Sequence, residues 1–210
     1  MLKIIALAAL MIGLSVSQAG NINWEKFNKE DGITVWRAEM PGTPIIAFKG
    51  KVLIDASIRK VLWVLADKAH RRDWVDRLDI NEELEIISPT KRVIYQSFKM
   101  PFLISNRDMV YQIELTKNRK NGNYFLKLQS INHKKSPKTI GVRAQLINSQ
   151  YKLVPKGKHQ TEVTVEILSD PKGMLPAWLV NLVQKSWPVK TLRGLRNQVK
   201  KDFVKEYKAL

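Results

Sequence analysis

The sequence predicts an α+β fold in which a curved antiparallel sheet wraps around one long C-terminal helix. Two strand patterns and a short helical pattern come first, five or six strand patterns follow in series, and a long helical pattern ends the chain. A meander that curls around a helix leaves space between the two layers. Unless the helix fills that space, we expect an internal hydrophobic cavity that holds a hydrophobic small molecule.

The first half of this order rests on residues 31–79. Strand patterns over residues 31–36 and 44–54 are separated by a Pro-Gly turn at residues 41–42. Residues 55–67 have an apolar stripe at helical spacing, and either Asp55 or Ser57 can cap this helix. The polar residues 68–79 are expected to form a short helix and a loop.

The second half alternates strand patterns with turn residues. The strands are expected over residues 84–88, 92–99, 107–116, 124–131, 142–154 and 162–168. The long helix is expected over residues 175–207, where Pro176 suits the first turn and Pro188 should kink or split the helix. The basic side chains of this helix either face the solvent on the side away from the sheet or contact anionic lipid.

The first twenty residues, MLKIIALAALMIGLSVSQAG, are typical of a secretory signal peptide. An apolar run follows Lys3, and Ser17 and Ala19 are spaced for a cut after Ala19. The run is short for a membrane span, although an uncleaved anchor stays open. We therefore predict a signal peptide over residues 1–19, one domain over residues 20–210, and a periplasmic or secreted mature protein.

The composition points to the partner. The 210 residues carry a formal net charge of +17, which attracts polyanions. Export argues against nucleic acid and favours an anionic membrane surface. The chain has no Cys and therefore folds without disulfides. A monomer is expected.

The segment FKMPFLISNRDMVY, residues 98–111, places two charges at the start of a strand pattern. Alternation puts Arg107, Met109, Tyr111 and Ile113 on the inward face. Two hypotheses stay open for Arg107. It pairs with Asp108 or another acid and pins the strand, or it binds a phosphate or carboxylate of the ligand. A surface position is the third alternative.

Three segments, in order, resemble the START (steroidogenic acute regulatory protein-related lipid transfer) domain family, nearest to its phosphatidylcholine transfer protein branch. They are RRDWVDRL, FKMPFLISNRDMVY and DPKGMLPAWLVNLVQKSWPVKTLRGL. The resemblance covers nearly the whole mature chain. It implies a helix-grip fold with a lipid-sized tunnel, which binds one lipid or sterol and moves it between membranes without a cofactor.

The resemblance also guides the ligand prediction. The sterol-binding branch is expected to have an inward basic residue where this chain has Ile113, which favours phospholipid over sterol. Four aromatic residues could form a cage for a quaternary ammonium, or could be plain core: Tyr111, Tyr124, Tyr151 and Trp178. The predicted ligand-binding residues are Arg107, Met109, Tyr111, Ile113, Tyr124, Trp178 and Leu182.

A basic collar is predicted at the cavity mouth. The loop that carries Lys134, Lys135 and Lys138 should lie at the same end as Lys172, in the loop that enters the last helix. These lysines are the predicted membrane contacts.

Catalytic and metal residues are not predicted, because the three His residues lie far apart and there is no G-x-S-x-G motif. Two alternatives stay open. One is a cyclase- or aromatase-like enzyme that uses the same cavity, and the other is a basic membrane-surface protein with a filled core.

Overall fold

The computed structural model describes residues 22–101 and 104–208, and the predicted signal peptide lies outside them. The described residues form one ten-stranded sheet in the order β1-β2-β3-β10-β9-β7-β6-β5-β4, with β8 paired to β6. The strands are β1 (Glu25–Glu30), β2 (Ile33–Glu39), β3 (Ile46–Ile54), β4 (Leu78–Ser88), β5 (Lys91–Phe98), β6 (Arg107–Lys117), β7 (Tyr124–Ser130), β8 (Val142–Arg143), β9 (Gln145–Pro155) and β10 (Thr161–Asp170).

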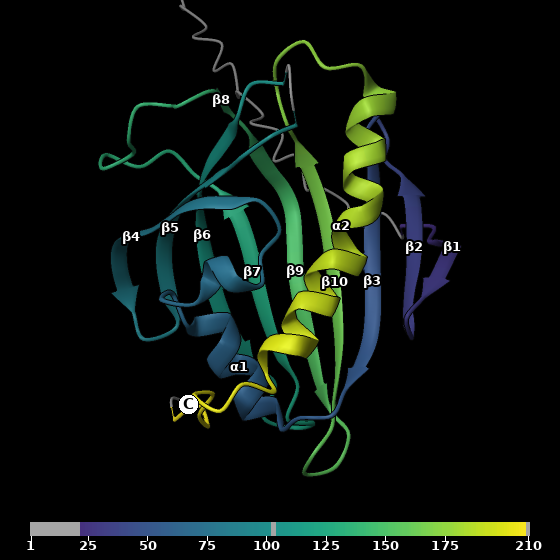
Figure 1. Ribbon diagram of the computed structural model, residues 1–210, viewed down its shortest axis with the longest axis vertical. Helices are drawn as coiled ribbons and strands as arrows, with labels where there is room; N and C mark the ends of the chain where they lie inside the picture. The colour runs from purple at the N-terminus through teal and green to yellow at the C-terminus, as the bar shows by residue number, and fades with distance from the viewer. Residues whose placement is uncertain (1–21, 102–103, 209–210) are drawn as a thin grey trace, which may run out of the picture.

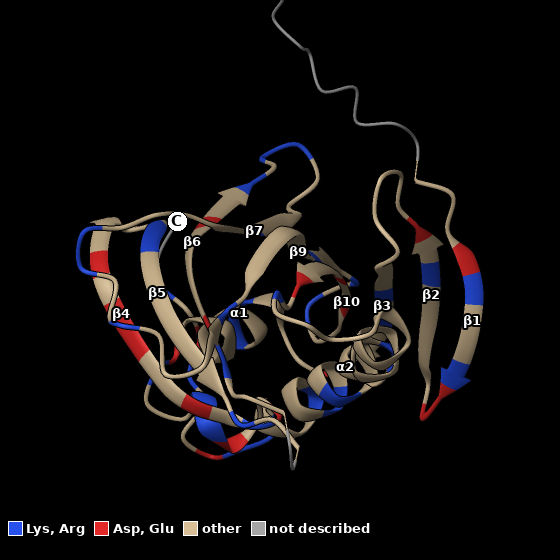
Figure 2. Ribbon diagram, turned by 90° about the horizontal axis from the view of Figure 1, so that it is seen from above, with Lys and Arg blue, Asp and Glu red and all other residues tan. Residues whose placement is uncertain are grey.

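Three helical segments complete the described fold: α1 (Ile58–Ala66), the short 3₁₀ helix η1 (Arg71–Asp73) and α2 (Ala177–Gln198). Figure 1 shows α2 lying along the inner face of the sheet, with α1 near the lower end. Seen from above in Figure 2, the sheet curves around both helices. The predicted α+β architecture is therefore confirmed.

The sheet is a meander joined at β3 and β10. These two strands pair antiparallel in the middle of the sheet. The next strand in the chain after β3 is β4, at the far edge of the sheet, and α1 and η1 form the connection between them. Every neighbouring pair in the main path is antiparallel, whereas β8 pairs parallel with the start of β6. Ser57 caps α1 by accepting a hydrogen bond from the Lys60 N–H at 3.2 Å, which is one of the two caps predicted.

Two glycines allow α2 to pack closely. A Cβ on Gly50 would lie 2.7 Å from Pro188 Cβ, and one on Gly194 would lie 2.3 Å from the Trp74 carbonyl oxygen. The helix continues through Pro188, and its axis changes direction near its middle in Figure 1. Beyond this point Val189, Leu192 and Leu195 are buried against the sheet and α1.

Several elements differ from the sequence prediction. Strand β1 is not among the predicted strands. All six of its residues are exposed, so its sequence has no apolar alternation. Strand β4 begins at Leu78 rather than residue 84, and its three register shifts break the alternation. The strand expected over residues 142–154 is divided into β8 and β9.

The long helix ends at Gln198 instead of residue 207. The following segment turns and crosses α1, where the Tyr207 N–H donates to the Arg59 carbonyl oxygen at 3.1 Å. Phe203, which lies within the predicted helix, therefore lies beyond the end of α2 and stacks on His70, with ring centroids 4.1 Å apart.

Hydrophobic residues pack on both faces of the sheet. The main core lies on the inner face, between the sheet and the two α-helices. A smaller cluster of Val93, Tyr95 and Val110 lies on the outer face, with Ile131 packed against it. The loop over residues 131–141 therefore has its own apolar support.

Candidate ligand-binding cavity

Two adjoining cavities lie between the inner face of the sheet and the helical segments. The inner cavity, of about 80 Å³, is bounded by residues of β5, β6, β7, β9, β10, η1 and α2. The side cavity, of about 70 Å³, lies toward α1, β4 and β5 and includes Tyr207 of the C-terminal segment. Five residues line both: Leu65, Arg71, Tyr111, Ile113 and Leu126. The predicted internal cavity is therefore present as two adjoining parts instead of one continuous space, and the core is not completely filled.

Strand β6 supplies part of both walls. Met109, Tyr111 and Ile113 line the inner cavity, and the last two also line the side cavity. Their spacing of two residues places them on one face of the strand, as alternation predicts. The inward direction of these three side chains is confirmed, while their contact with a ligand stays a prediction.

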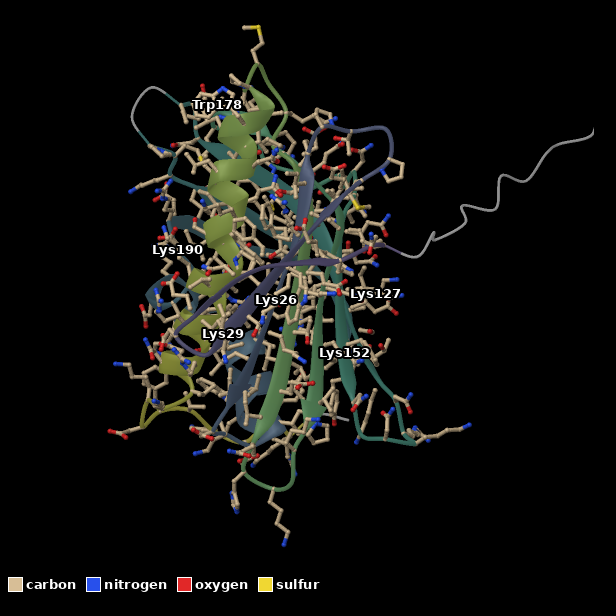
Figure 3. The ribbon with its side chains drawn as sticks, turned by 90° about the vertical axis from the view of Figure 1, so that its right-hand side faces the viewer. Lys26, Lys29, Lys127, Lys152, Trp178 and Lys190 are labelled. Atoms are coloured by element: carbon tan, nitrogen blue, oxygen red, sulfur yellow. The ribbon has the colours of Figure 1, made fainter. Side chains whose placement is uncertain are left out.

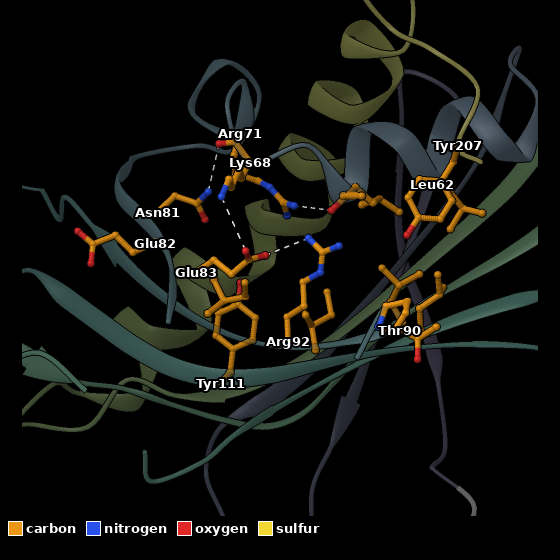
Figure 4. Close-up of a pocket in the computed structure, with 17 residues that line it drawn as sticks. Leu62, Lys68, Arg71, Asn81, Glu82, Glu83, Thr90, Arg92, Tyr111 and Tyr207 are labelled. Atoms are coloured by element: carbon orange, nitrogen blue, oxygen red, sulfur yellow. Dashed lines mark hydrogen bonds and ion pairs between the residues drawn. The ribbon is translucent and has the colours of Figure 1, made fainter. Parts of the chain in front are cut away.

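Arg71 lies where the two cavities meet. It comes from η1, and its Nη2 donates to the carbonyl oxygen of Leu65 at the end of α1 (Figure 4). Its guanidinium carbon is 5.6 Å from the centroid of the Trp74 ring. Its Nε is buried and has no hydrogen-bond partner in the described part of the chain. A buried guanidinium donor without an acceptor is costly, so this group is suited to an anionic ligand.

Two buried tyrosines lie near this guanidinium. Burial raises the pKa of Tyr111 to about 12 and also raises the pKa of Tyr151, and the positive charge of Arg71 opposes both changes. Both phenols line the inner cavity and stay protonated at neutral pH. They can therefore donate hydrogen bonds to a ligand.

The other two cations of the side cavity share one carboxylate, and Glu82 also lines this cavity. The Glu83 carboxylate lies 2.9 Å from Arg92 Nη1 and 3.7 Å from Lys68 Nζ (Figure 4). Among the described residues, Arg71 has no carboxylate within ion-pair distance. Arg71 is therefore the cavity cation that is available to a bound anion.

Arg107 does not line either cavity, contrary to the ligand-binding hypothesis. Its guanidinium is buried and donates to the carbonyl oxygens of Ser105, Pro171 and Lys172, the last two at 3.2 Å. The alternative pairing with Asp108 is also wrong, because the two side chains point to opposite faces of β6. Arg107 holds the loop that enters α2.

Asp108 points to the outer face and holds a different loop. It is fully buried and accepts hydrogen bonds from the Tyr95 hydroxyl at 3.2 Å, the Ile140 N–H at 3.1 Å and Arg143 Nε. The charged pair at the start of β6 therefore anchors two loops, one on each side of the sheet.

Three other predicted ligand residues lie outside the cavity lining. Trp178 and Leu182 are 68% and 52% exposed, because they follow one face of α2 while Val180 and Gln184 face the sheet. Tyr124 is buried in the main core at the far end of β7, where it pairs with Lys117 of β6. The four-residue aromatic cage is therefore not assembled, although Tyr111 and Tyr151 share the inner cavity.

The predicted collar lysines lie on two loops that meet. Lys134, Lys135 and Lys138 are exposed on the loop over residues 131–141, and Lys172 is exposed just before α2. A Cβ on Gly173 would lie 3.5 Å from Arg107 Nη2 and 3.6 Å from Val142 Cγ2, so the second loop touches the base of the first. Both loops are at the upper end in Figure 1.

Sequence reasoning missed Arg71. The segment RRDWVDRL has five charged residues around Trp74. Nothing in their order shows which of them points inward. Only the contact with Leu65 and the position of α2 across Trp74 direct Arg71 into the cavity.

Within residues 22–101 and 104–208, no helix is both long and apolar enough to span a membrane.

The comparisons with known proteins agree with this architecture. The START domain model matches residues 4–202. An uncharacterized protein of Pseudomonas aeruginosa is 27% identical over 206 residues, covering 95% of this chain and 98% of its own. Phosphatidylcholine transfer protein of Bos taurus is 27% identical over 167 residues, with 78% of each chain covered.

A solved structure matches as well. The STAR-related lipid transfer protein fragment from Xanthomonas axonopodis has a TM-score of 0.76 and 27% identity, and the match covers 85% of this chain and 99% of that chain. The predicted resemblance is therefore confirmed, and this chain belongs to the START domain family.

Proposed function

We propose that this protein binds one phospholipid in the two adjoining cavities and carries it between membranes. The observation that carries the proposal is the partly buried Arg71, whose buried Nε lies in the cavity lining and keeps a free donor. Apolar walls suit acyl chains, and a desolvated guanidinium suits a phosphate. The lipid-transfer names of two relatives support the same function.

Phosphate recognition favours a phospholipid over a sterol. A sterol has a hydroxyl group and no anionic group, so it would leave the charge of Arg71 without an anionic partner in the cavity. Choline recognition by an aromatic cage has less support, since only two of the four aromatic residues considered line the cavity. We therefore propose that the phosphate, rather than the rest of the head group, is the main polar contact.

Loading requires the cavity to enlarge. Pockets for drug-sized ligands hold roughly 300–1,000 Å³, several times the volume of either cavity here. The second half of α2 is tied down by ion pairs of Lys190 with Asp76 and of Arg193 with Glu30. The first half is tied by hydrogen bonds of Asn181 and Gln184 to backbone groups. We propose that the first half moves outward during loading.

The proposed membrane contact combines charge and apolar surface. The collar lysines lie at the end where α2 begins, and Met174, Trp178 and Leu182 are exposed there. Figure 3 shows Trp178 near the upper end of α2, while Lys127 and Lys152 lie on the outer sheet face. Lysines attract anionic lipid, and exposed apolar side chains can enter the interface. We propose that this membrane faces the periplasm or the outside of the cell, as the predicted signal peptide suggests.

Transport without chemistry is part of the proposal. The enzyme alternative expects a bound compound to be converted, whereas a carrier returns the lipid unchanged. Native mass spectrometry of protein purified from its exporting host distinguishes the two. A co-purified phospholipid that stays intact during incubation supports a carrier, and its conversion would favour the enzyme.

The role of Arg71 is tested with two lipids that have the same acyl chains. Arg71→Leu should weaken binding of a phospholipid roughly tenfold to a hundredfold, because a charge-assisted hydrogen bond contributes about 1.5–3 kcal/mol. Binding of the corresponding diacylglycerol, which lacks the phosphate, should change little. The exposed neighbour provides the control variant, Arg72→Leu. Equal losses for both lipids would contradict phosphate binding by Arg71.

A further inference from the structure

The hydroxyl of Ser149 belongs to a polar residue in the lining of the inner cavity. Ser149 lies on β9 and is only 6% exposed. Its Oγ is buried and has no hydrogen-bond partner among the described residues. Buried side-chain polar atoms usually have a partner, so an unpaired one in a cavity wall suggests that a ligand supplies it.

The cross-strand neighbours of Ser149 have apolar side chains. Its cross-strand partners are Leu128 on β7 and Ile167 on β10, and both side chains line the same cavity. Leu146 also lines this part of the cavity. An unpaired hydroxyl does not stabilise such a wall, because alanine would fill the position without burying a polar atom.

The position relative to Arg71 indicates which ligand atom is involved. The next inward residue on β9 is Tyr151, and successive inward positions on a strand lie about 7 Å apart. Arg71, Tyr151 and Ser149 all line the inner cavity, and the charge of Arg71 acts on the Tyr151 phenol. A ligand whose phosphate contacts Arg71 would therefore place its next polar groups near Ser149.

Resting on the proposed function, we infer that Ser149 donates a hydrogen bond to an ester carbonyl of the bound lipid. In a glycerophospholipid, the ester groups join the phosphate-bearing glycerol to the acyl chains. An ester carbonyl accepts this bond, whereas the ether oxygen of a dialkyl lipid is not a carbonyl acceptor. The site is thus selective for ester-linked over ether-linked phospholipids.

The test compares diacyl phosphatidylglycerol with the dialkyl ether of the same head group and chain length. Each lipid displaces a fluorescent phospholipid from the mature protein. The unchanged protein should bind the ester lipid roughly three- to tenfold more tightly, as expected for one neutral hydrogen bond. Ser149→Ala should bind the two lipids equally. Asn148→Ala, on the exposed opposite face of β9, should keep the preference.

Three results would overturn the inference. They are equal affinity for both lipids in the unchanged protein, an ester preference that persists in Ser149→Ala, and a lower melting temperature of ligand-free Ser149→Ala. The last would show that the hydroxyl is already satisfied in the free protein. If the protein binds both lipids equally, only the inference fails. If it binds neither, the proposed function fails as well.

Discussion

Gly50 of β3 lies directly beneath Pro188 of α2. A Cβ on Gly50 would be 2.7 Å from Pro188 Cβ and 2.9 Å from Leu192 Cδ1. Contacts this short require the helix or the strand to shift. Pro188 also separates the half of α2 that contributes Trp178 from the half that is tied by ion pairs. The missing side chain at Gly50 therefore sets how closely the helix approaches the sheet.

Gly50→Ala should destabilise the protein by about 1–3 kcal/mol, as overpacking of a core does. Urea unfolding followed by tryptophan fluorescence measures this change in the free energy of unfolding. Lys51→Ala, on the outer face of the same strand, removes only a partly exposed ion pair with Glu162 and should cost less than about 1 kcal/mol. Equal effects of the two variants would show that α2 is not held at this contact.

Asp108→Ala should destabilise the protein by about 3 kcal/mol. This is the lower end of the range for breaking a buried ion pair, because the Arg143 side chain keeps 31% exposure. Amide hydrogen exchange at Ile140 should also accelerate, since Asp108 accepts that N–H. Asp79→Ala removes a more exposed pair with Lys99 and should change neither quantity much.

Tyr111 should make stability fall at alkaline pH. Burial raises its folded-state pKa from 10.0 to about 12. Above pH 10 the unfolded phenol loses its proton first, so the contribution of Tyr111 is complete below pH 10 and is lost as pH rises toward 12. Tyr111→Phe should therefore reduce the decrease in the free energy of unfolding between about pH 9.5 and about pH 11.5. An unchanged slope would place the Tyr111 phenol in water.

Replacing Lys134, Lys135 and Lys138 together by Gln should weaken binding to anionic vesicles by up to roughly a hundredfold, because each surface Lys contributes at most about 1 kcal/mol. The effect should shrink at high salt, where charges are screened. Cosedimentation at two salt concentrations measures it. The control replaces Lys117, Arg119 and Lys120, which are exposed at the other end of β6. If both triple variants dock alike, the collar is not the docking face.

The exposed side chains of α2 should add a contribution that salt does not remove. Trp178→Ala combined with Leu182→Ala should reduce vesicle binding roughly tenfold or more, because burying one large apolar side chain contributes about 1.5–3 kcal/mol. Ile86 and Ile87, exposed on the edge strand β4, provide the control double variant. Equal binding by both double variants would exclude insertion of α2.

Features that depend on local pattern can be predicted from the sequence alone. Alternation along residues 107–115 placed Met109, Tyr111 and Ile113 on the cavity side, because successive side chains of a strand must point to opposite faces. Ser57 was one of two predicted caps for α1, because capping depends on a side chain three residues before the N–H that it accepts. The three matching segments identified the family, which also implies the cavity.

Which polar groups face the cavity depends on contacts between segments that are distant in the sequence. Arg71 is directed inward by its hydrogen bond to Leu65 and by the packing of α2 across Trp74. Arg107 instead donates hydrogen bonds to carbonyl groups 64 and 65 residues away in the sequence. Trp178 and Leu182 face outward because close packing at Gly50 fixes the rotation of α2. These outcomes depend on contacts between distant segments, and such contacts leave no periodic signal in the sequence.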